Sequence, residues 1–142
     1  MSEEPRKSDI GTDISLIGDE HVRRYQETDG EVGYIWNGVT ALLFTYTGRK
    51  SSEKRTRAII CTKIGDSYAI IASKGGAPNH PLWYLSLQEN PEVDVQVKAD
   101  KFKAIARTAQ GAERAAIWAE AVKHWPNFDV YQSRTEREIP VV

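Results

Sequence analysis

The stretch RAIICTKIGDSYAIIASK, residues 57–74, decides the fold class, because it contains two apolar segments separated by a short turn. The two segments, residues 57–64 and 67–74, are rich in isoleucine and other side chains that favour β-strands. Gly65 and Asp66 stand between them, and a glycine–aspartate pair is typical of a two-residue hairpin turn. The stretch therefore predicts an antiparallel β-hairpin.

Further strands extend this hairpin into a sheet. Residues 39–47, VTALLFTYT, predict a strand that ends at Gly48. Residues 93–99 and 101–107 flank Asp100 as a second hairpin, in which apolar and polar side chains alternate as in a half-buried strand. Hairpins, in place of alternating strands and helices, argue against a Rossmann sheet. They favour a mainly β or α+β fold, such as a small barrel.

Two helices are predicted beside the sheet. Residues 79–91, NHPLWYLSLQENP, have the pattern of a short helix, with Asn79 as its N-cap and Pro81 in its first turn. Residues 111–125, GAERAAIWAEAVKHW, predict a longer helix that ends before Pro126. Its expected apolar stripe consists of Ala115, Trp118, Ala119, Val122 and Trp125.

The two ends of the chain differ in character. Residues 1–18 are polar and mixed in charge, which predicts a mobile N-terminal leader before a single domain of residues 19–142. A short helix is expected at the start of this domain, with Gly30 as its natural end. Residues 127–138 predict a second short helix or turn, and residues 139–142, IPVV, predict a final strand.

The composition excludes several classes of protein. A chain of 142 residues with 40% hydrophobic and 27% charged side chains suits one soluble domain with a single core. The 19 basic and 20 acidic residues give a net charge of −1, so no global attraction to nucleic acid is expected. The lone cysteine, Cys61, fits a reducing cytoplasm. No apolar run approaches the ~18 residues of a membrane span, and no metal-ligand spacing is present.

Positive charge gathers in TGRKSSEKRTR, residues 47–57, a loop between two predicted strands. Five cations against the single acid Glu53 give a local charge of +4 in a chain whose total is −1. These cations are Arg49, Lys50, Lys54, Arg55 and Arg57. Such a loop can bind phosphate or carboxylate, because arginine presents a planar fork of donors to these groups. A solvated charged loop is the alternative interpretation.

A second candidate anion site is SKGGAPNHPLWY, residues 73–84, which follows directly from a predicted strand. Its first four residues combine a cation with glycines whose backbone N–H groups can approach a ligand: Ser73, Lys74, Gly75 and Gly76. Adjacent antiparallel strands can bring this segment near residues 47–57, and two cationic loops at one rim would hold a long polyanionic tail. Apolar residues that can support a planar ring follow: Ala77, Pro78 and Trp83. A surface turn is the alternative.

Tyr131 is the best candidate for a catalytic side chain. It lies in a polar context, so its hydroxyl is expected to reach a substrate or to donate a proton. Ser73 and His80 lack any signature such as GxSxG, so nucleophilic catalysis is not expected. Basic loops, a floor for a planar ring and the lack of an acid–base set suggest that a bound cofactor supplies the chemistry.

The order of several segments is similar to that of one known family. TGRKS, Arg55, ASKGG, HPLWYLSLQENP, GAERAAIWAEAV and YQSRTEREIPVV together resemble the deazaflavin-dependent nitroreductases of actinobacteria, from about Tyr34 to the C-terminus. The resemblance implies a split β-barrel of the flavin-reductase-like type with short peripheral helices. It also implies an oxidoreductase that uses coenzyme F420, a deazaflavin with a phosphate and a polyglutamate tail, as a hydride donor.

The resemblance further implies roles for individual residues. The cations of the first loop would hold the tail: Arg49, Lys50 and Arg55, beside Arg57. The second loop would contact the phosphate through Ser73, Lys74 and Gly75, beside Gly76, and the ring through Ala77, Pro78, Asn79 and Trp83. Tyr131 matches a tyrosine on the substrate side. Trp125 and Phe128 stand where members that activate nitroimidazoles carry tyrosines, and Ser86 replaces the asparagine that is usual in the family's WYLNL motif.

We therefore expect an F420-dependent reductase that transfers a hydride to an electron-poor acceptor such as a quinone, a nitro compound or a conjugated enone. Two alternatives stay open: an FMN-dependent split-barrel oxidoreductase, and a deazaflavin-binding protein without turnover. The expected partner is a small-molecule electron acceptor, with no nucleic acid and no membrane span. The protein is expected in the cytoplasm as a monomer or homodimer, with peripheral contact to the inner face of the cell membrane left open.

Overall fold

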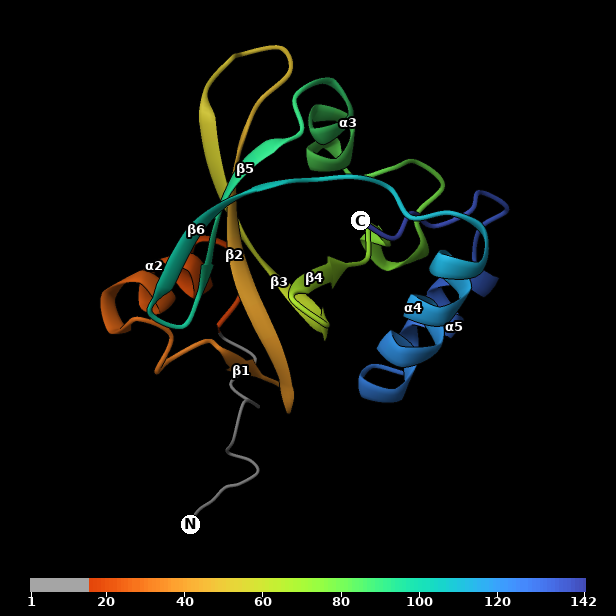
Figure 1. Ribbon diagram of the computed structural model, residues 1–142, viewed down its shortest axis with the longest axis horizontal. Coiled ribbons are helices and arrows are strands. Elements are labelled where there is room, and N and C mark those ends of the chain that lie inside the picture. Colours follow the sequence, from red (N-terminus) through yellow and green to blue (C-terminus); the bar gives the residue numbers. More distant parts are fainter. Residues whose placement is uncertain (1–15) are drawn as a thin grey trace.

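The computed structural model describes residues 16–142, and the greater part of the expected leader, residues 1–15, lies outside the described residues. One antiparallel sheet dominates it, with the strand order β4-β3-β2-β5-β6 and β1 paired with β2 (Figure 1). The strands are β1 (Ile35–Trp36), β2 (Val39–Thr47), β3 (Lys54–Ile64), β4 (Ser67–Ile70), β5 (Glu92–Val97) and β6 (Asp100–Ile105). The strands joined by short connections pair as the hairpin pattern predicts, whereas β5 follows α3 and pairs with β2.

The two predicted hairpins are present, and one of them turns at a different place. Ile64 pairs with Ser67 across Gly65–Asp66, so the first hairpin turn is confirmed. In the second hairpin Asp100 is not a turn residue, since it pairs with Val97 as the first residue of β6. The chain turns one step earlier, where Lys98 adopts a left-handed φ of 56°.

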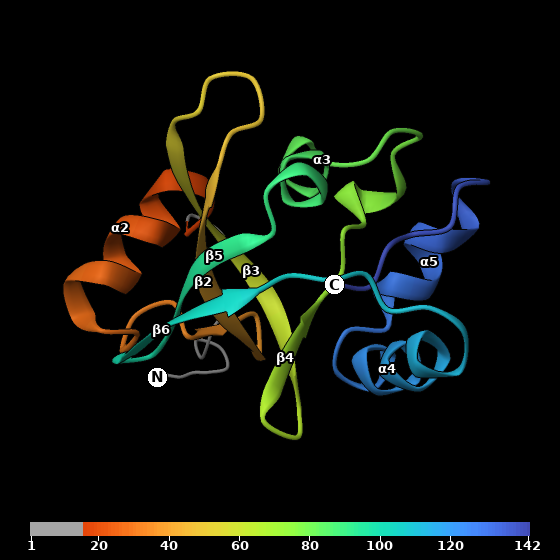
Figure 2. The same cartoon turned by 45° about the horizontal axis from the view of Figure 1, so that its top comes forward.

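The sheet curls until its two edge strands approach each other (Figure 2). The rings of Tyr68 on β4 and Phe102 on β6 stack with their centroids 6.2 Å apart. Apolar side chains from β2, β5 and α3 fill the concave side and form the main core, among them Leu42, Phe44, Leu87, Val93 and Val95. The fold is therefore an antiparallel half-barrel of the split-barrel kind with short helices around it, as expected from the sequence.

Within residues 16–142, four α-helices and one short 3-10 helix accompany the sheet: α2 (Gly18–Thr28), η1 (Lys74–Gly76), α3 (Leu82–Glu89), α4 (Gly111–His124) and α5 (Asn127–Ser133). The expected N-cap of α3 was wrong. Pro81 occupies the cap position, and Asn79 lies two residues further out and is exposed. Proline suits this place because it lacks an N–H group and its φ of −59° leads directly into the helix.

The buried face of α4 is rotated relative to the predicted stripe. Trp118, Val122 and Trp125 are partly buried as expected, but Ala115 and Ala119 are exposed. Ala121 is the fully buried residue of this helix, at 1% exposure, and Ile117 packs beside it. Alanine carries too little apolar surface to set a helix face alone, so the larger side chains determine the orientation.

The last residues of the chain close one end of the half-barrel. Val141 forms isolated bridges with Ile71 and Ala109, and Val142 exchanges two backbone hydrogen bonds with Ile70, each 2.9 Å long. Ile71, Ala109 and Val141 belong with Ile139 to a second core cluster beside α4 and α5, whereas Ile70 and Val142 pack in the main core. The predicted terminal strand therefore exists as a pair of single bridges.

Helix α2 is anchored to the sheet through Tyr25, which is fully buried. Its hydroxyl donates to the carbonyl of Ala41 at 3.0 Å and accepts a bond from the backbone N–H of Lys98 at 2.8 Å. The helix ends at left-handed Asp29, and the N–H of Gly30 returns to the carbonyl of Tyr25, close to the predicted end. Among residues 16–142, no helix is both long and apolar enough to cross a membrane.

Candidate functional site

Two adjoining cavities lie on the side of the sheet between α2, α3 and α5. The first, which we call the charged groove, has a volume of about 710 Å³ and follows the β2–β3 loop and the start of α3. The second, which we call the aromatic pocket, has a volume of about 390 Å³ and lies between α2 and α5. Arg57, Lys74, Pro81 and Trp83 line both cavities. The two form one continuous site.

Cations dominate the charged groove. Its charged lining within residues 16–142 consists of Arg49, Lys50, Arg55, Arg57 and Lys74, with Asp19 as the one acid. Arg49 and Lys50 come from the β2–β3 loop, and Lys74 comes from the loop after β4. Arg55 and Arg57 belong to the first residues of β3, so the expected loop of residues 47–57 is shorter than predicted. The cations of both segments nevertheless converge on one groove. The only ion pair formed by these five cations within residues 16–142 joins Arg55 to Glu53 at 3.7 Å. Both side chains of that pair are more than half exposed, so the pair contributes little to stability.

A hydrogen bond between two segments fixes the rim of the charged groove. The backbone N–H of Arg49 donates to the hydroxyl of Ser86, which is 4% exposed on α3. Ser86 is the residue that replaces the asparagine of the family pattern, and its position shows a packing role between loop and helix. The β2–β3 loop and α3 are therefore held together where the groove begins.

The loop after β4 makes a tight left-handed turn. Lys74, Gly75 and Gly76 have φ values of 48°, 63° and 85°. The N–H of Gly76 donates to Ser73 and that of Ala77 to Lys74 inside this turn, so these two N–H groups are already engaged. A Cβ atom on Gly75 would meet nothing within 4 Å, whereas one on Gly76 would lie 2.5 Å from the carbonyl oxygen of Tyr131. Gly75 therefore faces open space, and Gly76 lets the loop pack closely against α5.

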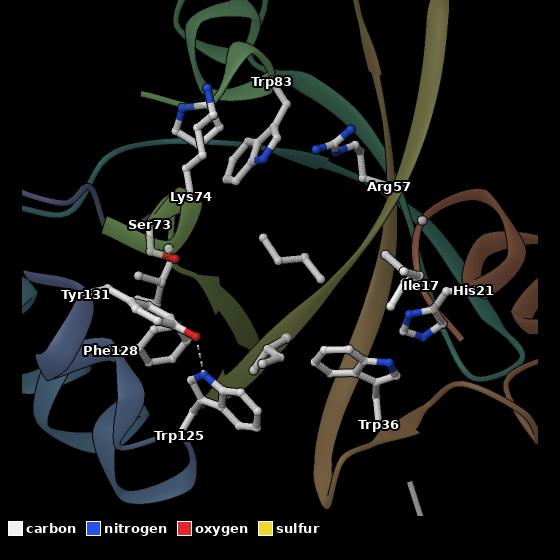
Figure 3. A pocket seen from close by; sticks show the side chains of 17 residues that line it. Ile17, His21, Trp36, Arg57, Ser73, Lys74, Trp83, Trp125, Phe128 and Tyr131 are labelled. Atoms are coloured by element: carbon white, nitrogen blue, oxygen red, sulfur yellow. Dashed lines mark hydrogen bonds between the residues drawn. The ribbon is translucent and has the colours of Figure 1, made fainter. Parts of the chain in front are cut away.

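Aromatic side chains form opposite walls of the aromatic pocket (Figure 3). One wall comes from the N-terminal part of the chain and consists of Ile17, His21 and Trp36. The other comes from the end of α4 and from α5 and consists of Trp125, Phe128 and Tyr131. The rings of Trp36 and Trp125 meet between the two walls, with centroids 6.1 Å apart. The pocket is thus bounded by flat apolar surfaces that suit a planar molecule.

The hydroxyl of Tyr131 has a defined donor beside it. The indole Nε1 of Trp125 lies 3.4 Å from this oxygen and donates to it (Figure 3). Because the hydroxyl accepts this bond, its own proton stays available for another acceptor. Tyr131 is partly buried and lines the aromatic pocket.

His21 is the one histidine on the wall of the aromatic pocket. It is 5% exposed, stacks on Trp36 with a centroid distance of 5.9 Å, and lies with Nε2 2.9 Å from the carbonyl of Gly33. A carbonyl only accepts, so Nε2 carries the proton. Burial lowers the pKa of His21, which keeps the ring neutral near pH 7.

Most of the residues proposed from the sequence meet in this site. Those that line the two cavities are Arg49, Lys50, Arg55, Arg57, Ser73, Lys74, Gly75, Trp83 and Tyr131. Gly76, Ala77, Pro78 and Asn79 do not line either cavity. Pro78 and Asn79 are exposed, and Gly76 is buried against α5. Trp83 is 5% exposed and packs edge-on against Phe44 at 5.1 Å, so it belongs to the core while one side reaches both cavities.

Some residues of the site were missed in the sequence. The wall of Ile17, His21 and Trp36 carries no local motif, because it reaches the pocket only through the packing of α2 and β1. Arg137 was also missed, and it holds the loop after β4 through several backbone carbonyls. Its position in the polar run before the terminal strand gives no signal of this contact.

The curled antiparallel sheet and the joined cationic and aromatic cavities define the class of protein as a cofactor-dependent oxidoreductase. The family model for F420H(2)-dependent quinone reductase matches residues 18–142, so the chain belongs to that family. Its cofactor is coenzyme F420, and its reaction transfers a hydride from the reduced coenzyme to a quinone-type acceptor.

Individual relatives agree with this assignment. The chain is 38% identical over 126 residues to an F420H(2)-dependent quinone reductase of Mycobacterium tuberculosis strain H37Rv. The aligned region covers 86% of this chain and 85% of that protein. A solved F420-H2-dependent reductase, FDR-A, is 41% identical and has a TM-score of 0.66, covering 71% of this chain and 90% of its own. A second solved chain, described as a domain-swapped dimer, is 38% identical with a TM-score of 0.68, covering 84% of this chain and 93% of its own.

Proposed function

We propose that the charged groove holds the anionic tail of coenzyme F420 and that the aromatic pocket holds its ring together with the acceptor. The donor set fits such a ligand, because among the described residues five cations line the groove against one acid. The continuity of the two cavities through Arg57 and Lys74 supports one ligand that spans both. This continuity is the observation that carries the proposal.

The protein's own contribution is mainly orientation and exclusion of water. Reduced coenzyme F420 supplies a hydride when bound. The walls built by Trp36, Trp125 and Phe128 restrict the position and orientation of a planar acceptor between them. This restriction favours a productive approach of the reacting atoms. The Tyr131 hydroxyl, oriented by the bond from Trp125, donates a hydrogen bond to an acceptor oxygen and can pass its proton there.

The pocket also bears on the range of acceptors. Its walls are flat and apolar, and the ionisable side chains that line it within residues 16–142 are His21, Arg57, Lys74 and Tyr131. Conjugated nitro compounds and enones share the planar shape and electron-poor character of quinones, so we propose them as further acceptors. Phe128 and Trp125 bring no hydroxyl, which leaves Tyr131 as the single phenol on this wall.

The test is binding and turnover with purified protein. The protein should bind F420, oxidise the reduced coenzyme when menadione is added, and bind F420 more tightly than FMN. Arg57→Gln should weaken F420 binding about 10- to 100-fold, the worth of one charge-assisted hydrogen bond, and reduce its dependence on salt. Lys54→Gln is the matched control, since Lys54 starts the same strand yet lines neither cavity.

Each outcome separates one alternative. Tighter binding of FMN would favour the FMN-dependent alternative, and binding of reduced F420 without menadione-dependent oxidation would favour a binding protein without turnover. Equal weakening in both variants would show that general charge, and not the groove, attracts the coenzyme.

We infer that the protein works in the cytoplasm, and the free buried thiol of Cys61 supports this compartment. We also infer that it assembles as a homodimer, which the solved relative described as a domain-swapped dimer supports. Light scattering after gel filtration tests the assembly, and a mass of 16.0 kDa would contradict it.

A further inference from the structure

One side chain from the C-terminal segment holds most of the loop after β4. The guanidinium of Arg137 donates from Nη2 to the carbonyl of Ser73 at 2.7 Å and from Nε to that of Ala77 at 2.9 Å. Its Nη1 donates to the carbonyl of Ala72 at 3.4 Å and lies 3.0 Å from Nδ1 of His80. All three nitrogens of the guanidinium are therefore engaged with residues 72–80.

Arg137 is itself fixed in place. Its carbonyl accepts a bond of 2.8 Å from the side chain of Gln132, and its N–H donates to the hydroxyl of Thr135 at 3.3 Å. Within the described residues, 16–142, it forms no ion pair with a carboxylate. A half-buried arginine without an acidic partner, whose donors all go to one loop, acts on the shape of that loop.

We propose that Arg137 is a positioning residue for coenzyme binding, and that it holds residues 72–80 in the binding conformation while His80 is neutral. The proposal rests on the proposed function, because it takes Ser73, Lys74 and Gly75 as part of the F420 site. Arg137 lines neither the charged groove nor the aromatic pocket, so it acts through the loop and not by contact with the coenzyme.

The bond to His80 gives the arrangement its dependence on pH. Arginine has only donors, so Nδ1 of His80 must accept and the proton must lie on Nε2. A protonated His80 would place two cationic donors 3.0 Å apart and would break the bond. Desolvation and then the charge of Arg137 lower the pKa of His80, as this geometry requires.

The other titratable neighbour of His80 does not compete for this role. Tyr84 on α3 presents its ring edge-on at a centroid distance of 5.0 Å. Its hydroxyl is paired with the hydroxyl of Thr108 at 2.7 Å, so it does not bond to the imidazole. Arg137 from the C-terminal segment and Tyr84 from α3 are thus the charged and titratable groups that face His80 within the described chain.

The first test compares two arginines replaced by lysine. Arg137→Lys keeps the charge, but one ammonium cannot reach the four acceptors, so F420 should bind about tenfold more weakly or worse at about pH 8. The matched control is Arg107→Lys, because Arg107 makes an exposed bidentate pair with Glu113 at 2.8 and 2.7 Å, away from both cavities. Its F420 affinity should equal that of the wild type. Fluorescence of oxidised F420 reports the dissociation constant.

The second test uses the acceptor itself. In His80→Asn the amide oxygen can accept from Arg137 and does not titrate, so this variant should match the wild type at about pH 8 and bind more tightly than it at about pH 5.5. The ratio of the two dissociation constants at each pH cancels any ionisation of the coenzyme. His80→Leu, without an acceptor, should bind weakly at both pH values.

The outcomes are distinguishable. A wild type that does not bind F420 at any pH overturns the proposed function and this inference with it. A wild type that binds, with Arg137→Lys of equal affinity, overturns the inference alone. The inference is also overturned if the ratio of the wild-type and His80→Asn dissociation constants for F420 does not change with pH. This comparison remains decisive if Arg137→Lys does not fold.

Discussion

Gly76 is the residue at which the packing of the loop against α5 can be tested most directly. Its φ of 85° is left-handed, and a Cβ atom added there would lie 2.5 Å from the carbonyl oxygen of Tyr131 and 3.0 Å from the Cβ of Arg134. The left-handed backbone conformation costs about 1–2 kcal/mol for any residue with a side chain. The close contacts of the added Cβ atom overpack the site, which costs about a further 1–3 kcal/mol. Gly76→Ala should therefore lower the free energy of unfolding by about 2–5 kcal/mol.

Gly75→Ala is the matched control for this experiment. Gly75 also has a left-handed φ, of 63°, but a Cβ atom there would meet nothing within 4 Å. Only the conformational cost of about 1–2 kcal/mol applies. A domain of this size has a total stability of roughly 7–20 kcal/mol, so both variants should fold. The two should differ by about 1–3 kcal/mol, or roughly 2–12 °C in the midpoint of thermal unfolding.

Differential scanning calorimetry of the two variants measures this difference. Titration with F420 then shows whether Gly76→Ala, which pushes the loop away from Tyr131, also weakens coenzyme binding. Equal midpoints for Gly75→Ala and Gly76→Ala would refute the close contact of the loop with α5, and with it the explanation of why a glycine stands at position 76.

Further outcomes follow from three buried polar groups. Tyr25→Phe should lower the free energy of unfolding by about 2–3 kcal/mol in urea titrations, because the N–H of Lys98 loses its buried acceptor. Burial raises the pKa of Cys61 to about 11, so a thiol reagent at neutral pH should label Cys61 only in urea; rapid labelling of the folded protein would contradict its burial. The same raised pKa makes stability fall as pH rises above the ordinary thiol value toward 11, because the unfolded chain loses that proton first. His21, with its lowered pKa, acts on the acid side: stability should fall as pH drops below about 6.5, where the unfolded chain takes up the proton, and His21→Gln should flatten that slope.

The strands were predictable because their signal is local. In β5 alternate side chains face the core, so the period of two is visible in six residues, and the turn at Gly65–Asp66 is encoded by the turn residues themselves. The turn near Asp100 was misplaced by one step, because lysine seldom adopts the left-handed conformation that Lys98 has here. The face of α4 was misjudged for a related reason, since the alanines there are compatible with either side.

The candidate site was predictable only in part. Residues 47–57 follow β2 and the second loop follows β4, and both of these strands pair antiparallel with β3, so the hairpin order places the two segments at the same end of the sheet. The wall of His21 and Trp36 depends on how α2 packs on the sheet, for which no short motif exists. Arg137 bonds to backbone carbonyls of the loop, and backbone acceptors are the same in every sequence, so no pattern could have revealed its partners.

The bonds between residues 72–80 and Arg137 also bear on how the protein is made. Ser73 and Arg137 are 64 residues apart in the chain. At a synthesis rate of about 5–20 residues per second, the ribosome adds Arg137 roughly 3–13 s after Ser73. In the last part of that interval, after Ile105 has been added, the nascent chain contains both hairpins but not the side chain that holds the loop. The two hairpins can therefore form during translation, whereas the loop acquires its final shape only once Arg137 has emerged.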